Sequence, residues 1–390
     1  MYERTVAKAL HARMLEPLGL MQVLTGPRQT GKSTALKQAC ASVPSPIHSA
    51  SADLADHLWL RTEWQQARNL ASARGEAILI VDEVQKIPSW SSVVKELWDE
   101  DRRNDVDLKV FLSGSSSLLL TKGLDESLMG RFELLRSPQW SFSECRDAFG
   151  YSLDDFIYFG GYPRSAQFVS DESRWRRFIV DSIVEPTISQ DVLAMAPVKK
   201  PALMRSLFTL GTQFSAQELS YNKMLGQLQD AGNTVTIAEY LDLLSAAGML
   251  TGLQKFDIRK VSTRKSSPRL MAHDSSLQSA LLDLPKEYAM RNTSTWGHLV
   301  ETTVGAYLLH RGVEEGFQVF WWREGTKEVD FVLRKGEQIT AIEVKSGRPK
   351  GLAGMKAFLS EYPQAFRMVI GSPETSLERF LSGDVPLFLI

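Results

Sequence analysis

The stretch "MQVLTGPRQTGKSTALKQA", residues Met21 to Ala39, decides the fold of the first part of the chain. It begins as an apolar strand, passes two glycines, Gly26 and Gly31, and continues as a helical pattern. The glycines allow the backbone to curl so that several N–H groups face one point. The start of the helix adds the positive end of its dipole. The stretch therefore predicts an anion-binding loop between a strand and a helix.

The loop matches the pattern GxxxxGK[ST], which binds nucleotide phosphates when a strand precedes it and a helix follows. Lys32 is expected to reach the β- and γ-phosphates, and the Ser33 hydroxyl is expected to bind Mg²⁺. ATP and Mg²⁺ are the cofactors that this motif predicts. The residues expected to surround the phosphates are Gly26, Pro27, Arg28, Gln29, Thr30, Gly31, Lys32, Ser33 and Thr34.

A second stretch, "AILIVDEVQKIP" at Ala77–Pro88, is a continuous apolar run that ends in two carboxylates. Such a run is typical of a strand buried on both faces of a parallel sheet. Asp82 is expected to hold the Mg²⁺, and Glu83 to polarise the water that attacks ATP. The alternative is an ordinary solvated strand end.

A third strand is predicted in "LKVFLSGSSSLLL", Leu108–Leu120. Its polar end suggests Ser113, and next Ser115, as a sensor of the γ-phosphate, although serines are also ordinary turn residues. Strands alternate with helices from Met21 to Pro138, and this alternation predicts a parallel three-layer α/β fold.

The stretches "GPRQTGKST", "LIVDEVQKIP", "LSGSSSLLL" and "GRFELL" resemble the AAA+-type P-loop ATPases that carry a C-terminal DUF4143 domain. The family usually has threonine where this chain has Ser33, and the hydroxyl is kept. The resemblance implies a homo-oligomer, such as a hexamer, in which Arg131 is an arginine finger that reaches a neighbour's ATP. The alternative is a surface arginine that pairs with a local carboxylate.

Four domains are expected: an ATPase core at 1–140, a helical lid and linker helix at 141–200, a winged-helix-like domain at 201–272, and a nuclease-like DUF4143 domain at 273–390. The winged helix follows from three helical patterns and then two short strands. The loop between those strands is basic, so it either binds DNA phosphates or is simply solvated. Its basic residues are Arg259, Lys260, Arg264, Lys265 and Arg269.

Near the C-terminus, "EVDFVLRKGEQITAIEVKSG" at 328–347 reads as a β-hairpin that carries Asp330, Glu343 and Lys345. Side chains two residues apart share one face of a strand, so these charges can converge. With Glu301 on an upstream helix, they have the order of a PD-(D/E)xK nuclease core. Asp330, Glu343 and Glu301 would hold Mg²⁺, and Lys345 would orient the attacking water.

The same four residues admit other interpretations. They can form a partly buried cluster of ion pairs, which needs no metal. They can also be a degenerate nuclease core that binds DNA or protein, or a chance pattern. Around them the basic surface expected of a DNA groove is modest.

The composition of the chain limits the classes of protein to which it can belong. The 390 residues have a formal net charge of −1 and only two cysteines, so DNA contact must come from local patches and a disulfide framework is excluded. Without a secretory core or a membrane-length apolar run, a cytoplasmic protein is expected.

The leading hypothesis is an ATPase that acts on DNA and has a possible Mg²⁺-dependent deoxyribonuclease domain. The alternative is an ATP-dependent oligomeric switch or scaffold with an inactive nuclease-like module.

Overall fold

The structure is a computed structural model that describes residues 2–53, 55–114, 127–193, 198–229, 232–258, 267–347 and 351–388. The chain forms two compact units, Met1–Gln139 and Trp140–Ile390. The first unit corresponds to the predicted ATPase core. The finer division of the remainder into lid, winged helix and nuclease-like domain stays a prediction.

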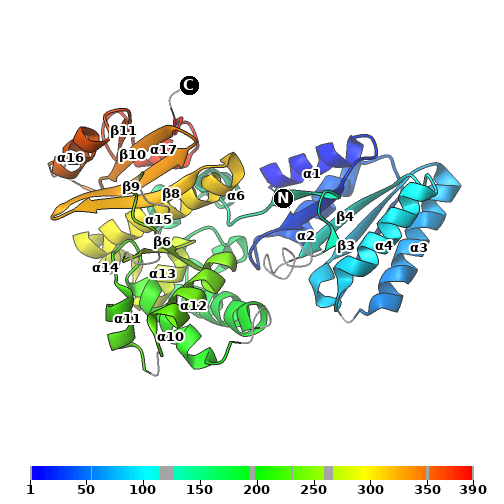
Figure 1. Cartoon of the computed structure of the whole chain (residues 1–390), viewed down its shortest axis with the longest axis horizontal. Helices are drawn as coiled ribbons and strands as arrows, with labels where there is room; N and C mark the ends of the chain where they lie inside the picture. The colour runs from blue at the N-terminus through cyan, green and yellow to red at the C-terminus, as the bar shows by residue number, and fades with distance from the viewer. Residues whose placement is uncertain are drawn as a thin grey trace. The chain divides into compact units, whose positions relative to one another are not determined.

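The first unit alternates helices and strands (Figure 1). Its elements are α1 (Thr5–Leu15), β1 (Met21–Thr25), α2 (Lys32–Ala39), η1 (Cys40–Ser42), β2 (Ile47–Ser51), α3 (His57–Arg74), β3 (Ala77–Asp82), η2 (Val84–Lys86), α4 (Trp90–Arg103), β4 (Leu108–Gly114) and β5 (Phe132–Arg136).

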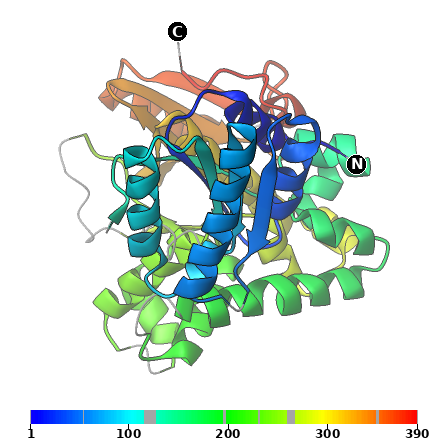
Figure 2. The same ribbon diagram turned by 90° about the vertical axis from the view of Figure 1, so that its right-hand side faces the viewer.

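The five strands of this unit form one parallel sheet in the order β2-β3-β4-β1-β5. Successive side chains of a strand point to opposite faces. Val23 accordingly packs in a core with residues of α3 and α4, whereas Leu24 packs with residues of α1 and α2. Helices therefore flank both faces of the sheet (Figure 1 and Figure 2). The predicted parallel three-layer α/β fold is confirmed.

The second unit begins with helices, which are α6 (Phe142–Phe149), α7 (Leu153–Phe159), η3 (Pro163–Phe168), α8 (Glu172–Ile179), the π-helical segments η4 (Val180–Val184) and η5 (Thr187–Val192), α10 (Pro201–Gln213), α11 (Tyr221–Gln227) and α12 (Thr234–Ala246). The local sequence explains where two of these helices begin. Ser141 and Glu144 form a capping box at α6, and Ser152 and Asp155 form one at α7.

The remaining elements of this unit are β6 (Leu250–Leu253), β7 (Arg269–Ala272), α13 (Ser275–Leu282), α14 (Lys286–Arg291), α15 (Thr293–Glu315), β8 (Gln318–Glu324), β9 (Lys327–Lys335), β10 (Gln338–Val344), α16 (Ala353–Glu361), β11 (Phe366–Ile370) and α17 (Leu377–Leu381). Strands β6 and β7 pair antiparallel after α10, α11 and α12. This is the element order from which the winged helix was inferred.

A four-stranded sheet in the order β11-β10-β9-β8 carries the predicted hairpin. Strands β9 and β10 pair antiparallel, with Phe331 opposite Ile342, so Asp330 lies beside the end of β10 that carries Glu343. The predicted hairpin is therefore confirmed. In the described part of the chain, no helix combines the length and apolar character that a membrane crossing requires.

Candidate functional site

The predicted phosphate loop joins β1 to α2 in the first unit, as the sequence indicated. Gly26 has no room for a side chain, because a Cβ atom there would lie 2.1 Å from the backbone oxygen of Ser137. Gly31 precedes α2 with a φ of 88°, a left-handed conformation that glycine adopts without strain. Both glycines are thus required by the local backbone.

Lys32 is buried at the start of α2, and its ammonium group turns back into the loop. Its Nζ atom donates hydrogen bonds to the backbone oxygens of Gly26, at 2.9 Å, and Pro27, at 2.7 Å. The positive charge is therefore held within the loop. This is where a cation is needed to bind the phosphates of a nucleotide.

Asp82, at the end of β3, accepts hydrogen bonds from two other elements. Ser33 Oγ, in the first turn of α2, donates to Asp82 Oδ2 at 2.6 Å. Ser113 Oγ, near the end of β4, donates to Asp82 Oδ1. The carboxyl ends of neighbouring parallel strands are the usual place for a ligand in such a sheet. The structure therefore brings together three predicted site residues; Ser115 lies outside the described residues.

Glu83 follows Asp82 in a left-handed backbone conformation, with a φ of 56°. This conformation costs a residue other than glycine roughly 1 kcal/mol or more, and such residues cluster at functional sites. The Glu83 backbone N–H donates to Asp82 Oδ1 at 3.0 Å. Its carboxylate accepts a hydrogen bond of 2.7 Å from Gln85. The turn fixes Glu83 next to Asp82, as the predicted role in water activation requires.

Arg131 pairs with a carboxylate of its own unit. Its Nε atom lies 2.8 Å from Asp99 Oδ1 and its Nη2 atom 3.2 Å from Asp99 Oδ2. The hydrogen bonds from the guanidinium lower the pKa of Asp99. The local pairing named as an alternative is thus present, and the arginine-finger role stays a prediction.

Arg4 is a loop-supporting residue that no motif indicated. It is 4% exposed, and its guanidinium donates to the backbone oxygen of Thr30 at 3.0 Å and to Ser137 Oγ at 2.9 Å. It thus joins the phosphate loop to the segment after β5. These partners lie 26 and 133 residues away in sequence, so no local pattern marks the contact.

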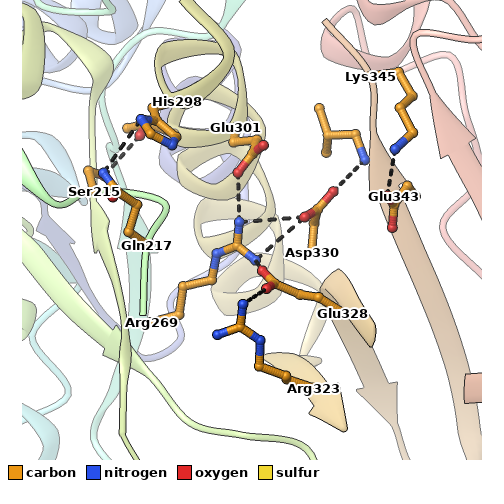
Figure 3. A network of polar contacts seen from close by, with 12 residues as sticks. Ser215, Gln217, Arg269, His298, Glu301, Arg323, Glu328, Asp330, Glu343 and Lys345 are labelled. Carbon is orange, nitrogen blue, oxygen red and sulfur yellow. Dashed lines mark hydrogen bonds and ion pairs between the residues drawn. The ribbon is translucent and has the colours of Figure 1, made fainter. Parts of the chain in front are cut away.

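In the second unit, the four predicted nuclease-like residues lie in one region, but they do not form one cluster of ligands (Figure 3). Lys345 Nζ donates to Glu343 Oε1 at 2.6 Å. Asp330 Oδ2 accepts a hydrogen bond of 2.8 Å from the Val344 backbone N–H. Among the described residues, no group of three or more His, Cys, Asp or Glu side chains is placed to hold a metal ion.

Arg269, from β7, is the residue that sequence reasoning misplaced. We expected it in the exposed basic loop of the winged helix, but it is buried and 2% exposed. Its guanidinium donates to Glu301 Oε2 and Glu328 Oε1, both at 2.6 Å. The expectation of an exposed wing cation is therefore wrong for Arg269. The other wing residues, Arg259, Lys260, Arg264 and Lys265, lie outside the described residues.

Burial changes the acidity of two of these carboxyls. Removal from water raises the pKa of Glu301, Asp330 raises it further, and Arg269 opposes the shift. Burial also raises the pKa of Glu343, and the hydrogen bond from Lys345 opposes that shift. Both carboxyls are therefore harder to ionise than usual, and in each case the cationic partner favours the ionised form.

Three family models match the chain. A model described as an AAA domain matches residues 20–146, one described as a domain of unknown function (DUF8612) matches 150–288, and another such domain (DUF4143) matches 296–384. The parallel sheet and the loop after β1 define an AAA-type P-loop ATPase domain. The chain thus combines an AAA-type P-loop domain with a C-terminal region that matches the DUF4143 model.

Similar proteins come from bacteria and archaea. An uncharacterized protein of Haemophilus influenzae is 23% identical over 83% of this chain and 82% of its own length. An uncharacterized protein of Mycobacterium tuberculosis is 26% identical over 83% of this chain and 69% of its own length. One of Methanocaldococcus jannaschii is 24% identical over 68% of this chain and 60% of its own length.

Two solved structures show a weaker likeness. A Walker-type ATPase of Pyrococcus abyssi has a TM-score of 0.48 and 14% identity, with 72% of this chain and 96% of that chain covered. A RuvB Holliday junction branch migration motor of Thermotoga maritima has a TM-score of 0.31 and 15% identity, with 63% and 87% covered. Both TM-scores lie below 0.5, so these likenesses say nothing about function.

Proposed function

We propose that the chain binds and hydrolyses ATP in its first unit. The observation that carries this proposal is the meeting of Ser33 and Asp82 beside the phosphate loop that holds Lys32. A cation and a hydroxyl from the start of α2 and a carboxylate from the end of β3 are thereby collected at one end of a parallel sheet. This is the set of groups that phosphoryl transfer from a nucleotide requires.

The oxygens of this site fit Mg²⁺. Hard cations of this kind take oxygen ligands and usually bind to one or two protein groups together with substrate phosphates. The Ser33 hydroxyl and the Asp82 carboxylate, already 2.6 Å apart, would hold the ion. When bound, the ion would neutralise charge on the phosphates. The surrounding residues then have separate tasks: Lys32 binds phosphate oxygens, Glu83 orients the attacking water, and Ser113 positions the Asp82 carboxylate.

ATP turnover in this proposal drives an oligomeric switch, and the DUF4143 domain serves as a binding module. The ion pairs of Arg269 support this choice over a nuclease, because they use carboxylate oxygens that a metal would need. Assembly would place Arg131 of one subunit near the ATP of the next. Action on DNA remains a second prediction, which rests on the sequence of the 259–266 loop.

One experiment separates these two outcomes. ATPase activity is measured with no DNA and with single-stranded, duplex and branched DNA, while the size of the assembly is measured by light scattering with ATP and with ADP. A switch predicts assembly that depends on ATP and turnover that is indifferent to DNA. Strong stimulation by any DNA would replace it by the DNA-acting hypothesis. No turnover under any of these conditions would reject ATP hydrolysis itself.

A further inference from the structure

Arg269 lies among carboxylates that the sequence assigned to a metal site. Its Nη2 atom lies 2.6 Å from Glu301, its Nη1 atom lies 2.6 Å from Glu328, and both Nη atoms lie 3.5 Å from Asp330 Oδ1 (Figure 3). The Arg269 side chain is only 3% exposed. A single guanidinium thus contacts carboxylates from the helix α15 and from β9, a strand of the hairpin sheet.

The remaining acidic groups also have cationic partners. Arg323 pairs with the second oxygen of Glu328 at 2.9 Å, and Lys345 pairs with Glu343 at 2.6 Å. Three basic side chains therefore accompany the four carboxylates of this region. Charge neutrality here does not call for a divalent ion, in contrast to a group of carboxylates that lacks basic neighbours.

The fit to Mg²⁺ is correspondingly poor. This ion demands near-ideal octahedral coordination by oxygen at about 2 Å. Of the predicted ligands, Glu301 is engaged by Arg269 and Asp330 Oδ2 by the Val344 N–H. Glu343 Oε2 is buried and makes no hydrogen bond with the described residues, so this oxygen is still available to a metal ion. Any ion near Asp330 Oδ1 would also face the guanidinium, which lies 3.5 Å from that oxygen.

We infer that the guanidinium of Arg269 is the cation that neutralises these carboxylates. It takes the place of the metal ion that a nuclease with this order of acidic residues would hold. The arginine lies on β7, so its ion pairs also link the paired strands β6 and β7 to the four-stranded sheet. Arginine suits this position because it stays charged when buried and its planar fork reaches several carboxylates at once. The inference concerns the second unit alone and does not depend on ATP hydrolysis.

Binding of Mn²⁺ to nucleotide-free, full-length protein tests the inference, with free Mn²⁺ measured by electron paramagnetic resonance. All proteins carry Asp82→Asn, which removes the carboxylate of the nucleotide site. The parent with Arg269 is expected to bind no Mn²⁺ at the hairpin site. Arg269→Met is expected to gain one bound Mn²⁺, and adding Asp330→Asn is expected to remove it. Arg334→Met changes a different arginine, on β9; it is the matched control and should gain none.

Two results would overturn the inference. The first is a parent protein that already binds one Mn²⁺ which Asp330→Asn removes, because the metal and Arg269 would then coexist. The second is a folded Arg269→Met protein that binds no Mn²⁺. Since loss of Arg269 strands buried carboxylates, this variant can fail to fold. Arg269→Lys keeps a positive charge, so it should fold and should bind no Mn²⁺. The comparison of the parent protein with and without Asp330→Asn leaves Arg269 unchanged, so it does not depend on the folding of an Arg269 variant.

Discussion

Ser33 of the phosphate loop and Asp82 at the end of β3 are joined by a hydrogen bond of 2.6 Å, although 49 residues separate them in sequence. The bond places the Ser33 hydroxyl, at the start of α2, against the carboxylate at the end of β3. We therefore expect both groups to bind one Mg²⁺, and this relationship is the basis of the first two predictions.

Lys32→Ala is expected to abolish ATP turnover, because the loop loses the ammonium group that would bind the β- and γ-phosphates. The measurement is steady-state phosphate release together with nucleotide binding. Lys37→Ala, an exposed lysine on the same helix, is the matched control and should keep activity. Turnover by Lys32→Ala at the rate of the Lys37→Ala protein would show that the loop is not the catalytic nucleotide site.

Glu83→Gln is expected to bind ATP but to hydrolyse it roughly a hundredfold more slowly, because a general base contributes about that factor. The Asp82 carboxylate and the Ser33 hydroxyl are unchanged, so affinity for ATP should be kept. Binding is measured with a fluorescent ATP analogue and turnover by phosphate release. Glu96→Gln, at an exposed carboxylate of α4, supplies the comparison. Unchanged turnover in Glu83→Gln would assign water activation to another group.

Arg131 should matter in the assembled oligomer if it is an arginine finger. Mixing Arg131→Ala with Lys32→Ala subunits is then expected to restore part of the ATPase activity, because some interfaces combine an intact loop with an intact arginine. Asp99→Asn is the control, since it breaks the local pair of 2.8 Å while keeping the arginine. If Asp99→Asn is as inactive as Arg131→Ala, and no mixture recovers activity in intact oligomers, the ion pair has a local structural role.

Lys345→Ala is expected to destabilise the second unit by about 3 kcal/mol, because it leaves Glu343 buried without its cation. The two side chains are 14% and 13% exposed, so water cannot replace the lysine well. Denaturant unfolding followed by circular dichroism measures the change in free energy. Lys356→Ala, at an exposed position of α16, should be close to wild type. Equal stability of the two variants would mean that water solvates Glu343.

His273 is expected to lower the stability of the second unit as the pH falls below about 6.5, the ordinary pKa of histidine, whereas the raised pKa values of Glu301 and Glu343 act in the opposite direction. Burial, together with the neighbouring His310, lowers the pKa of His273 to about 3. Between these values the unfolded chain binds a proton that the folded chain does not, so unfolding becomes more favourable as the pH falls. His273 Nε2 lies 2.5 Å from Thr251 Oγ1, a contact that the neutral ring can keep.

For this prediction the measurement is the free energy of unfolding between pH 7.5 and 5, with a slope of up to about 1.4 kcal/mol per pH unit from one group. His273→Gln should be less stable than wild type at neutral pH, and this difference in stability should shrink as the pH falls. His57→Gln, at an exposed histidine of α3, should leave the dependence unchanged. Parallel curves for wild type and His273→Gln would place the acid sensitivity elsewhere.

The sequence by itself determined the ATPase core, because its signals are local. Gly26, Gly31, Lys32 and Ser33 stand at fixed spacing, and the apolar run that ends at Asp82 is typical of a buried strand of a parallel sheet. The β9–β10 hairpin was also predictable, since alternating side chains and a turn set its register. Each of these features is encoded within a few consecutive residues.

Only the tertiary structure decided which charges neutralise one another. Arg269 looked like part of an exposed basic loop, yet it is buried against Glu301 and Glu328, 32 and 59 residues further along the chain. Arg4 reaches Ser137 in the same way across 133 residues. A buried arginine is neutralised by whichever carboxylates packing brings within hydrogen-bond distance, and spacing along the chain does not encode that distance. The chain order of acidic residues thus suggested a metal site, whereas packing placed a guanidinium among them.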